Sequence, residues 1–448
     1  MSRKKSEQAT GLNVRVDAAE LRDAACLLAS MSGRAPRESC SSTRIKHASK
    51  TQIEVPTPGR MQFEVVGHGL TLAVMAGDKL PRTEARVRLD SALVNRPGRC
   101  TVPARDFSRL AAGLRDVATL EVGSLAQGAG GSPVLCADDD TGSYEFSLAT
   151  GPDDENLLPL PDLALWTADV SHISEPFRAE AEQKATVAAS EDSAAQAERV
   201  LKMPGLRWVE LVERAAYCAL DDETHPILTG LLLQAREGWQ LTAVATDTYR
   251  LARYRLMLND SVPDFKALVP VVPLRKWVGV TRREAECVMR LGTRHVTFVA
   301  GRYAFRATLV EGEYPDYEKV IPRDPALGYR IDAPAWKAAL AALAPAAEAD
   351  SWRVVLTDVL GGLCLSAGGE LGQVRAKVPC CPASVLPGKA GFGAPTVYNL
   401  RYLQQASRSA KRTVSLATDG PLNAAQILVD DLTADQHLTV LMPMQIMK

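Results

Sequence analysis

Residues 271–283 read VVPLRKWVGVTRR, a short β-like run and a proline followed by a basic stretch whose apolar residues have helical spacing. The same order occurs twice more in the chain. The three predicted basic helices cover residues 105–115, 275–283 and 400–412. An order of elements that repeats along a sequence indicates a repeated structural unit, so these helices predict three similar units.

A second kind of helix precedes each basic helix in the chain. It begins with a polar residue, and its apolar residues recur with a period of 3.6. The helices of this kind cover residues 17–29, 205–220 and 332–343, and in the first of them Asp17 and Glu20 have the spacing of a capping box. Successive starts are about 125 residues apart in the later two units but farther apart in the first two. The longer step predicts an insertion between the first and second units.

The sequence between the helices alternates apolar and polar residues or is rich in valine, and both patterns are typical of β-strands. Predicted strands cover residues 61–66, 85–89, 239–245, 295–299, 303–309, 353–356 and 413–416. The predicted fold class is therefore α+β, with two helices and several strands in each of three units.

The predicted insertion centres on residues 174–199, where Ala, Ser and Glu dominate and large apolar side chains are few. Such a composition buries too little apolar surface to order the chain, which predicts a flexible linker. A charged, alanine-rich helix lying on the surface is the alternative. The predicted organisation is a disordered tail (1–10), domain 1 (11–163), a linker (164–203), domain 2 (204–325) and domain 3 (326–448).

Composition excludes several classes of protein. The chain has 448 residues with 52 lysines and arginines against 53 aspartates and glutamates, so bulk charge gives no general attraction to nucleic acid or membrane. The basic start is not followed by an apolar stretch, and no apolar run approaches the ~18 residues of a membrane span, so we expect a cytoplasmic protein.

No constellation of residues indicates catalysis. The nine cysteines form no Cys-x-x-Cys pair, and the six histidines are not at metal-ligand spacing. Phosphate loops, zinc-protease helices, nucleophile elbows and dinucleotide fingerprints are missing from the sequence. We therefore expect no metal, no cofactor and no enzyme activity.

Eleven basic residues lie on the recurring basic helices. They are Arg105, Arg109, Arg115, Arg275, Lys276, Arg282, Arg283, Arg401, Arg408, Lys411 and Arg412. The spacing predicts that Arg401, Arg408 and Arg412 share one face of a helix. Such a face suits DNA phosphates contacted without base reading, and a solvated helix face is the alternative. Aromatic residues make up 5% of the chain, which disfavours a stacking platform for single strands.

Four ordered strings resemble the bacterial DNA sliding clamp, the beta subunit of DNA polymerase III. They are THPILTG (224–230), VATDTYRLA (244–252), EGEYPDYEKVIP (311–322) and VLMPM (440–444). Residues 101–105 and 144–148 are similar to parts of that family's first domain. The resemblance covers nearly the whole chain outside the tail and linker. It implies a head-to-tail dimeric ring of three similar domains per protomer, with helices lining the lumen and antiparallel sheets outside.

The resemblance also implies a function: a non-catalytic processivity factor that encircles double-stranded DNA, slides along it without sequence preference, and tethers replicative and repair polymerases. The implied partners are DNA, the DNA polymerase III catalytic subunit and other polymerases through short Leu/Phe motifs, the clamp loader ATPase and a second copy of the chain. The expected DNA-contacting set is Arg34 together with the basic helix residues given above other than Arg283. Two alternatives are a clamp-like paralogue that acts as a repair or mobile-element adaptor with a weak or absent ring, and an enzyme that has borrowed the fold.

The family's peptide-binding pocket lies between its second and third domains. The matching positions are Leu228, Thr246, Tyr249, Arg250, Leu251, Pro315, Val320, Asn399, Tyr402, Pro421, Val440, Met442 and Met444. An apolar trough with flexible methionines accepts aliphatic and aromatic anchors, each worth roughly 1.5–3 kcal/mol when fully buried. Without the resemblance, Leu228, Leu251 and Val320 would be interpreted as strand core.

Overall fold

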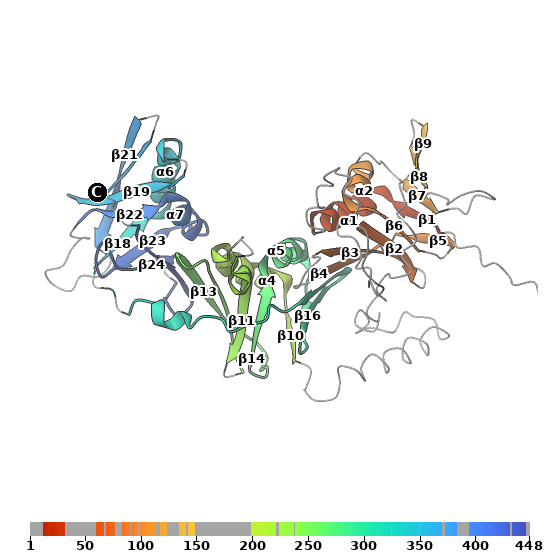
Figure 1. The fold of residues 1–448 in the computed structure, drawn as a ribbon, viewed down its shortest axis with the longest axis horizontal. Helices are drawn as coiled ribbons and strands as arrows, with labels where there is room; N and C mark the ends of the chain where they lie inside the picture. The colour runs from red at the N-terminus through yellow and green to blue at the C-terminus, as the bar shows by residue number, and fades with distance from the viewer. Residues whose placement is uncertain are drawn as a thin grey trace, which may run out of the picture. The chain divides into compact units, whose positions relative to one another are not determined.

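The structure is a computed structural model (Figure 1). It describes residues 12–31, 60–66, 69–76, 83–89, 91–96, 99–112, 117–122, 134–139, 142–147, 199–220, 224–236, 238–323, 325, 327–348, 350–369, 372–382, 394–430 and 432–444. The predicted tail, most of the predicted linker, Arg34 and Arg115 lie outside these residues.

One order of elements occurs three times: a strand, a helix, three strands, a strand, a helix and three strands. The first repeat consists of β1 (Leu12–Asp17), α1 (Ala18–Met31), β2 (Arg60–Val66), β3 (Gly69–Ala76), β4 (Thr83–Leu89), an additional β5 (Leu93–Arg96), β6 (Arg99–Pro103), α2 (Ala104–Ala111), β7 (Val117–Val122), β8 (Val134–Asp139) and β9 (Gly142–Ser147). The second consists of β10 (Arg199–Met203), α4 (Gly205–Ala215), β11 (Gly230–Arg236), β12 (Gln240–Thr246), β13 (Arg250–Met257), β14 (Phe265–Pro270), α5 (Val271–Val280), β15 (Cys287–Leu291), β16 (His295–Ala300) and β17 (Tyr303–Thr308). The third consists of β18 (Leu327–Asp332), α6 (Ala333–Leu343), β19 (Arg353–Val359), β20 (Gly362–Gly369), β21 (Gly372–Pro382), β22 (Thr396–Asn399), α7 (Leu400–Ala406), β23 (Thr413–Thr418), β24 (Ala425–Val429) and β25 (His437–Leu441).

Short 3-10 helices follow or separate several of these elements. They are η3 (Ala216–Cys218), η4 (Pro226–Thr229), η5 (Thr281–Arg283), η6 (Tyr317–Val320) and η7 (Ala344–Ala346). The recurring order confirms the predicted α+β class with antiparallel sheets.

Strand pairing joins neighbouring repeats. The sheets run β5-β1-β7-β8-β9, then β10-β15-β16-β17-β4-β3-β2-β6, and β14-β11-β12-β13-β25-β24-β23-β18-β21-β20-β19-β22. The first and second repeats meet where β17 pairs with β4, and the second and third where β13 pairs with β25, both antiparallel. The chain divides into two compact units, namely 1–206 with 276–309 and 207–275 with 310–448. The domain boundaries given above stay predictions.

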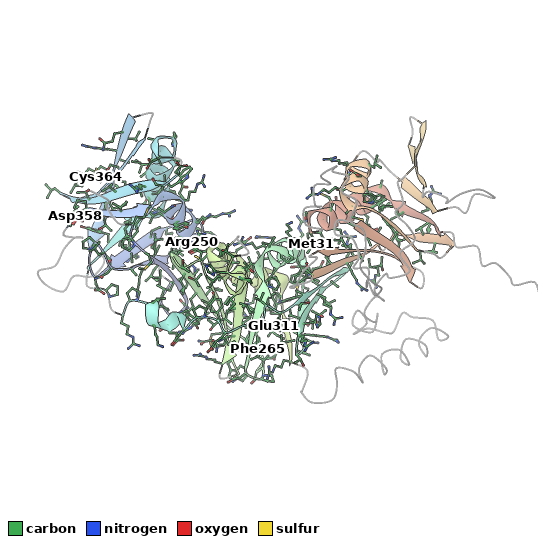
Figure 2. All side chains as sticks on the ribbon, viewed as in Figure 1. Met31, Arg250, Phe265, Glu311, Asp358 and Cys364 are labelled. Carbon is green, nitrogen blue, oxygen red and sulfur yellow. The ribbon has the colours of Figure 1, made fainter. Side chains whose placement is uncertain are left out.

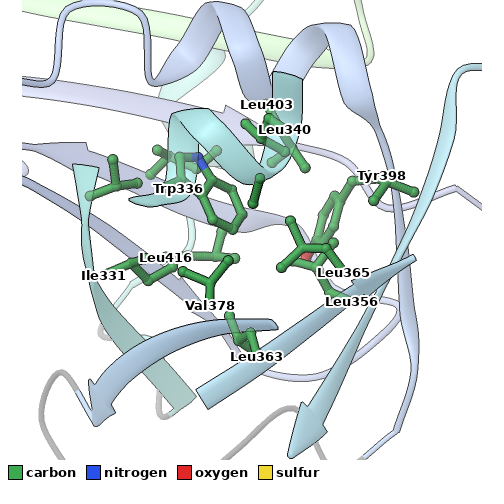
Figure 3. Close-up of a cluster of buried hydrophobic side chains, with 14 of the residues drawn as sticks. Ile331, Trp336, Leu340, Leu356, Leu363, Leu365, Val378, Tyr398, Leu403 and Leu416 are labelled. Carbon is green, nitrogen blue, oxygen red and sulfur yellow. The ribbon is translucent and has the colours of Figure 1, made fainter. Parts of the chain in front are cut away.

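The core of the third repeat lies between its helices and strands. Trp336 and Leu340 of α6 are buried, and Figure 3 shows both in one cluster with Leu365 of β20. The Trp336 Nε1 donates a hydrogen bond to Ser407 Oγ at 3.2 Å, which satisfies the one polar atom of the buried indole. Asp332 caps α6 by accepting from the Ala335 N–H at 3.0 Å, as its place before the apolar run predicts.

Aromatic pairs occupy the corresponding places in the other unit. Trp277 of α5 lies 5.0 Å from Phe298 between ring centroids, and Phe63 meets Phe107 of α2 edge to face at 4.7 Å. These rings are fully buried, so each basic helix is fixed to its sheet by a large apolar side chain. Its exposed face is then free to carry charge.

The predicted capping box is half right. Asp17 Oδ1 accepts from the Glu20 N–H at 2.9 Å, as predicted. The Glu20 carboxylate was expected to accept from the Asp17 N–H, but it accepts from the Ser91 N–H, the Ser91 hydroxyl and the Arg302 guanidinium. The half-buried Arg302 guanidinium offers the carboxylate a hydrogen bond between two charged groups, which a backbone N–H cannot offer.

The stretch VVP at 271–273 is the start of α5 and not a β-like run, because β14 ends at Pro270. Pro273 is compatible with this assignment, since the first turn of a helix has no intrahelical use for its N–H groups. The two other stretches before basic helices are strands, β6 and β22, as predicted.

The third basic helix ends earlier than predicted. It was expected to reach Arg412, but α7 ends at Ala406, so Arg401, Arg408 and Arg412 do not share one helical face. Lys337 Nζ donates to the Arg408 and Ala410 carbonyls, and the Asp430 carboxylate accepts from the N–H groups of residues 411–413. These partners satisfy the backbone in a turn and remove the need for another helical turn.

The linker also ends earlier than predicted. Residues 199–203, expected to belong to it, form β10 and pair with β15. Leu201 and Met203 are buried with Lys202 exposed between them, an alternation that suits a strand. None of the described helices is long and apolar enough to cross a membrane.

Candidate functional site

The candidate site lies at one end of three adjacent strands. Arg250 of β13 and Ala425 of β24 are both paired with Leu441 of β25. The β12–β13 turn, the β23–β24 turn and the chain after Leu441 therefore meet at the same end of the sheet. Four positions that match the family's pocket lie in these segments, namely Tyr249, Pro421, Met442 and Met444, and four more lie at the adjoining strand ends, namely Thr246, Arg250, Leu251 and Val440.

A buried apolar cluster forms the floor of the site. Leu251 and Val440 are cross-strand partners, and each side chain is 3% exposed. Around them lie Leu232, Val244, Leu268, Val310, Tyr314, Tyr317 and Leu438. Leu228 is also buried, so these predicted site residues support the surface rather than form it.

Four large apolar side chains are exposed around this floor. We call Tyr249, Val320, Leu422 and Met442 the apolar patch; they are 64%, 55%, 76% and 43% exposed. The Met442 N–H donates to the Tyr249 carbonyl at 2.9 Å, which fixes these two side by side. Val320 is the last residue of η6, and Tyr317 of the same element belongs to the buried cluster. Leu422 lies in the β23–β24 turn, two residues before Ala424, which packs against that cluster. Grouped exposed apolar side chains of this kind mark interaction surfaces.

Leu422 was missed by sequence reasoning. It follows Pro421, which the resemblance does assign, but it lies in a turn without periodicity, and turns give no signal for an apolar surface role.

The β12–β13 turn is held by side chains of its own residues. Asp247 Oδ1 accepts from the N–H groups of Tyr249 at 3.0 Å and Arg250 at 2.9 Å. Thr246 Oγ1 donates to the Arg250 carbonyl at 2.7 Å and accepts from the Thr248 N–H at 3.2 Å. Thr248 has φ +76°, which is rare for a β-branched residue and needs such support. The turn therefore presents Tyr249 in a defined position.

The remaining predicted residues frame the patch. Asn399 caps α7 by accepting from the Tyr402 N–H at 3.2 Å, and the Met444 N–H donates to the Val397 carbonyl at 2.8 Å. Pro315 is exposed two residues before η6, which begins at Tyr317 and ends at Val320. Figure 2 shows Arg250 where β13 lies beside α7.

The predicted DNA-contacting residues divide into exposed and engaged groups. Arg105, Arg109, Arg282, Arg401, Arg408, Lys411 and Arg412 are exposed. Lys276 donates to the Ser30 carbonyl, and burial together with the charge of Arg105 lowers the pKa of its ammonium group. Arg275 is half-buried and donates to the Ala216 carbonyl, so its guanidinium is engaged within the protein.

Arg401 of this set has an aromatic partner. Its guanidinium carbon lies 3.8 Å from the centroid of the Trp352 ring, which fixes the charge at the start of α7. Within the described part of the chain, no group of three or more His, Cys, Asp or Glu residues could hold a metal ion.

Comparisons with known proteins agree with this geometry. Residues 203–316 match the family model for the DNA polymerase III beta subunit, central domain. A beta sliding clamp of Salmonella typhimurium is 26% identical over 283 residues, which is 61% of this chain and 65% of that protein. The beta sliding clamp of Pseudomonas aeruginosa is 31% identical over 117 residues, or 25% of this chain and 31% of that protein.

Solved structures share the fold over nearly the whole chain. The DNA polymerase III beta subunit of Thermotoga maritima has a TM-score of 0.71 at 17% identity, covering 97% of this chain and 100% of its own. A sliding clamp from Pseudomonas aeruginosa bound to griselimycin has a TM-score of 0.70 at 19% identity, with the same coverage.

Proposed function

Because this chain belongs to the DNA polymerase III beta sliding-clamp family, we propose that it is a processivity clamp that closes around duplex DNA as a head-to-tail dimer. In this role it slides along DNA in the cytoplasm and tethers polymerases, including the DNA polymerase III catalytic subunit, through peptides that bind the apolar patch. A clamp loader ATPase opens it for loading. The family consists of non-catalytic subunits, so the role includes no chemical step.

The single observation that carries the ring is the pairing rule at the two seams. At the first seam β4 pairs with β17, and at the second seam β13 pairs with β25. In each pair the earlier strand is the last of the three that follow its repeat's first helix. The later strand is the last of the three that follow the next repeat's second helix. By this rule the third repeat offers β21 and the first repeat offers β9. Among the described strands, β9 is the last strand of its sheet. One edge of β21 is open along most of its length, because β21 meets β18 only through residues 380–382.

A second copy of the chain supplies the missing partner for each edge. Open strand edges pair readily with one another, and here the same antiparallel geometry is already used twice. Two copies that pair β21 with β9 at both ends form a closed assembly with twofold symmetry. The seams inside one protomer therefore support the interface proposed between two.

Encirclement explains how a chain of net charge −1 can hold DNA. A closed ring retains DNA by topology, so its phosphate contacts can be few, weak and independent of sequence. Exposed residues such as Arg105, Arg109 and Arg401 suffice for contacts of this kind. Weak contacts also permit sliding.

The apolar patch supports the tethering role. An extended peptide with Leu and Phe side chains would cover Tyr249, Val320, Leu422 and Met442 and bury their exposed area. The sliding clamp from Pseudomonas aeruginosa was solved bound to griselimycin, and we expect that compound to bind the apolar patch of this chain.

Sedimentation velocity from micromolar to nanomolar concentration tests the ring, and griselimycin titration followed by calorimetry tests the patch. We expect a species of twice the 48.3 kDa protomer mass and saturable binding of griselimycin. A persistent monomer that still binds griselimycin would favour the adaptor alternative over the clamp.

A further inference from the structure

Arg250 occupies a peptide-site position of the family, yet its side chain is only 10% exposed. Its Nε donates to Asp247 Oδ2 at 2.8 Å, and its Nη1 donates to Gln405 Oε1. Its guanidinium carbon lies 4.1 Å from the Tyr402 ring centroid. These contacts use the guanidinium inside the protein, which leaves little of it for a ligand.

The partners of Arg250 belong to two separate elements. Asp247 lies in the β12–β13 turn, whereas Tyr402 and Gln405 lie on α7, three residues apart and so on one helical face. Arg250 is thus a bridge between the turn that presents Tyr249 and the helix that carries Tyr402. The planar fork of arginine suits this task, because it can donate in two directions while stacking on a ring.

The turn needs an external tie. Thr248 at φ +76° is held in a conformation that a β-branched residue rarely adopts. The Asp247 carboxylate that supports the turn is oriented by Arg250, and Arg250 is in turn held by Gln405. Strain of this kind persists where surrounding contacts overdetermine the backbone.

We propose that Arg250 and Gln405 form a positioning lock for the peptide site: they do not contact the peptide, but hold the Tyr249 turn against α7 in the orientation that binding requires. The inference rests on the proposed function, because it assigns roles within the same site. Gln405 is a positioning residue that the family resemblance does not assign. Pre-organisation of this kind raises affinity by removing the entropy cost of ordering the turn on binding.

The test measures binding of a fluorescein-labelled peptide with a Leu-Phe pair to the full chain by fluorescence anisotropy. Gln405→Ala removes the acceptor without touching the apolar patch, and we expect roughly tenfold weaker binding. Gln405→Glu keeps an acceptor for the guanidinium and should restore affinity. Gln436→Ala is the matched control: it also loses one hydrogen bond, to the Thr433 N–H, but lies beyond the opposite end of β25 and should bind as the unaltered chain does.

Hydrogen exchange separates positioning from a general loss of structure. In Gln405→Ala the N–H groups of Tyr249 and Arg250, which donate to Asp247, should exchange faster while those of β25 stay unchanged. A double-mutant cycle with Arg250→Lys should be non-additive, because both substitutions break the same lock.

The outcomes distinguish the lock from the proposed function. If the unaltered chain binds peptide and Gln405→Ala binds equally well, the lock is overturned and the function stands. If the unaltered chain binds no peptide, the proposed tethering role and the positioning role both fail. Equal weakening by Gln405→Ala and Gln436→Ala would also overturn the lock, since it would indicate a general loss of stability.

Discussion

The seam between the second and third repeats contains a buried histidine that should make the fold sensitive to acid. His437 of β25 is 1% exposed and pairs with Tyr254 of β13, whose ring meets the imidazole edge on at 5.8 Å between centroids. Its Nε2 lies 3.1 Å from the Arg214 carbonyl, so this nitrogen carries the proton. The Nδ1 is buried without a partner, and protonating it would create a second N–H with no acceptor.

The magnitude follows from the pKa of this group. Burial lowers the pKa of His437 to about 4; the charge of Arg214 acts in the same direction, while the Arg214 carbonyl and Glu210 oppose it. The unfolded chain, with a histidine pKa of about 6.5, takes up a proton first as the pH falls. Stability is therefore full above pH 6.5 and is lost as the pH falls toward 4, and linkage gives about 2 kcal/mol between pH 7 and pH 5.

Urea unfolding followed by tryptophan fluorescence at pH 7 and pH 5 measures this loss. His437→Gln stays neutral at both pH values, so its pH-dependent loss should be smaller than that of the unaltered chain by about 2 kcal/mol. The exposed His225→Gln serves as the control and should keep the full loss. Equal losses in the unaltered chain and His437→Gln would refute the reasoning.

Met442→Asp places a charge in the apolar patch and should weaken peptide binding at least tenfold by anisotropy, whereas Leu360→Asp, 96% exposed on a hairpin away from the patch, should have no effect. Asp430 accepts hydrogen bonds from three backbone N–H groups and has φ +53°. Asp430→Ala removes this acceptor and should lower the free energy of unfolding, measured by urea titration, by roughly 2–3 kcal/mol. Asp430→Asn should lower it less. Arg401→Ala should reduce the slope of log affinity for duplex DNA against log salt by about 0.9, and an unchanged slope would remove Arg401 from the phosphate-contacting set.

The order of elements could be predicted because it depends on local patterns. Alternation marked β2, β4, β16, β17 and β23 within two residues of their ends, and Asp332 marked the start of α6. What alternation cannot specify is the partner of a strand. The pairing of β17 with β4 joins residues more than two hundred positions apart, and this pairing, with that of β13 and β25, joins neighbouring repeats.

Features decided by distant side chains also escaped prediction. The end of α7 depends on Lys337 and Asp430, neither of which is close to it in sequence. Trp352 stacks on Arg401 from 49 positions away, so the local sequence around Arg401 did not reveal this contact. In the candidate site, the resemblance supplied the candidate segments, and burial divides their residues into a floor, an exposed patch and an internal bridge.

Trapping on end-blocked DNA tests encirclement most directly. The full chain is mixed with linear duplex DNA biotinylated at both ends, streptavidin is added to block the ends, and the complex is washed in high salt, which dissociates ordinary phosphate contacts. A closed ring that has threaded onto the DNA stays bound after the wash and is released when a restriction enzyme cuts the duplex. Loss of all protein in the wash, or retention that survives the cut, would contradict the account.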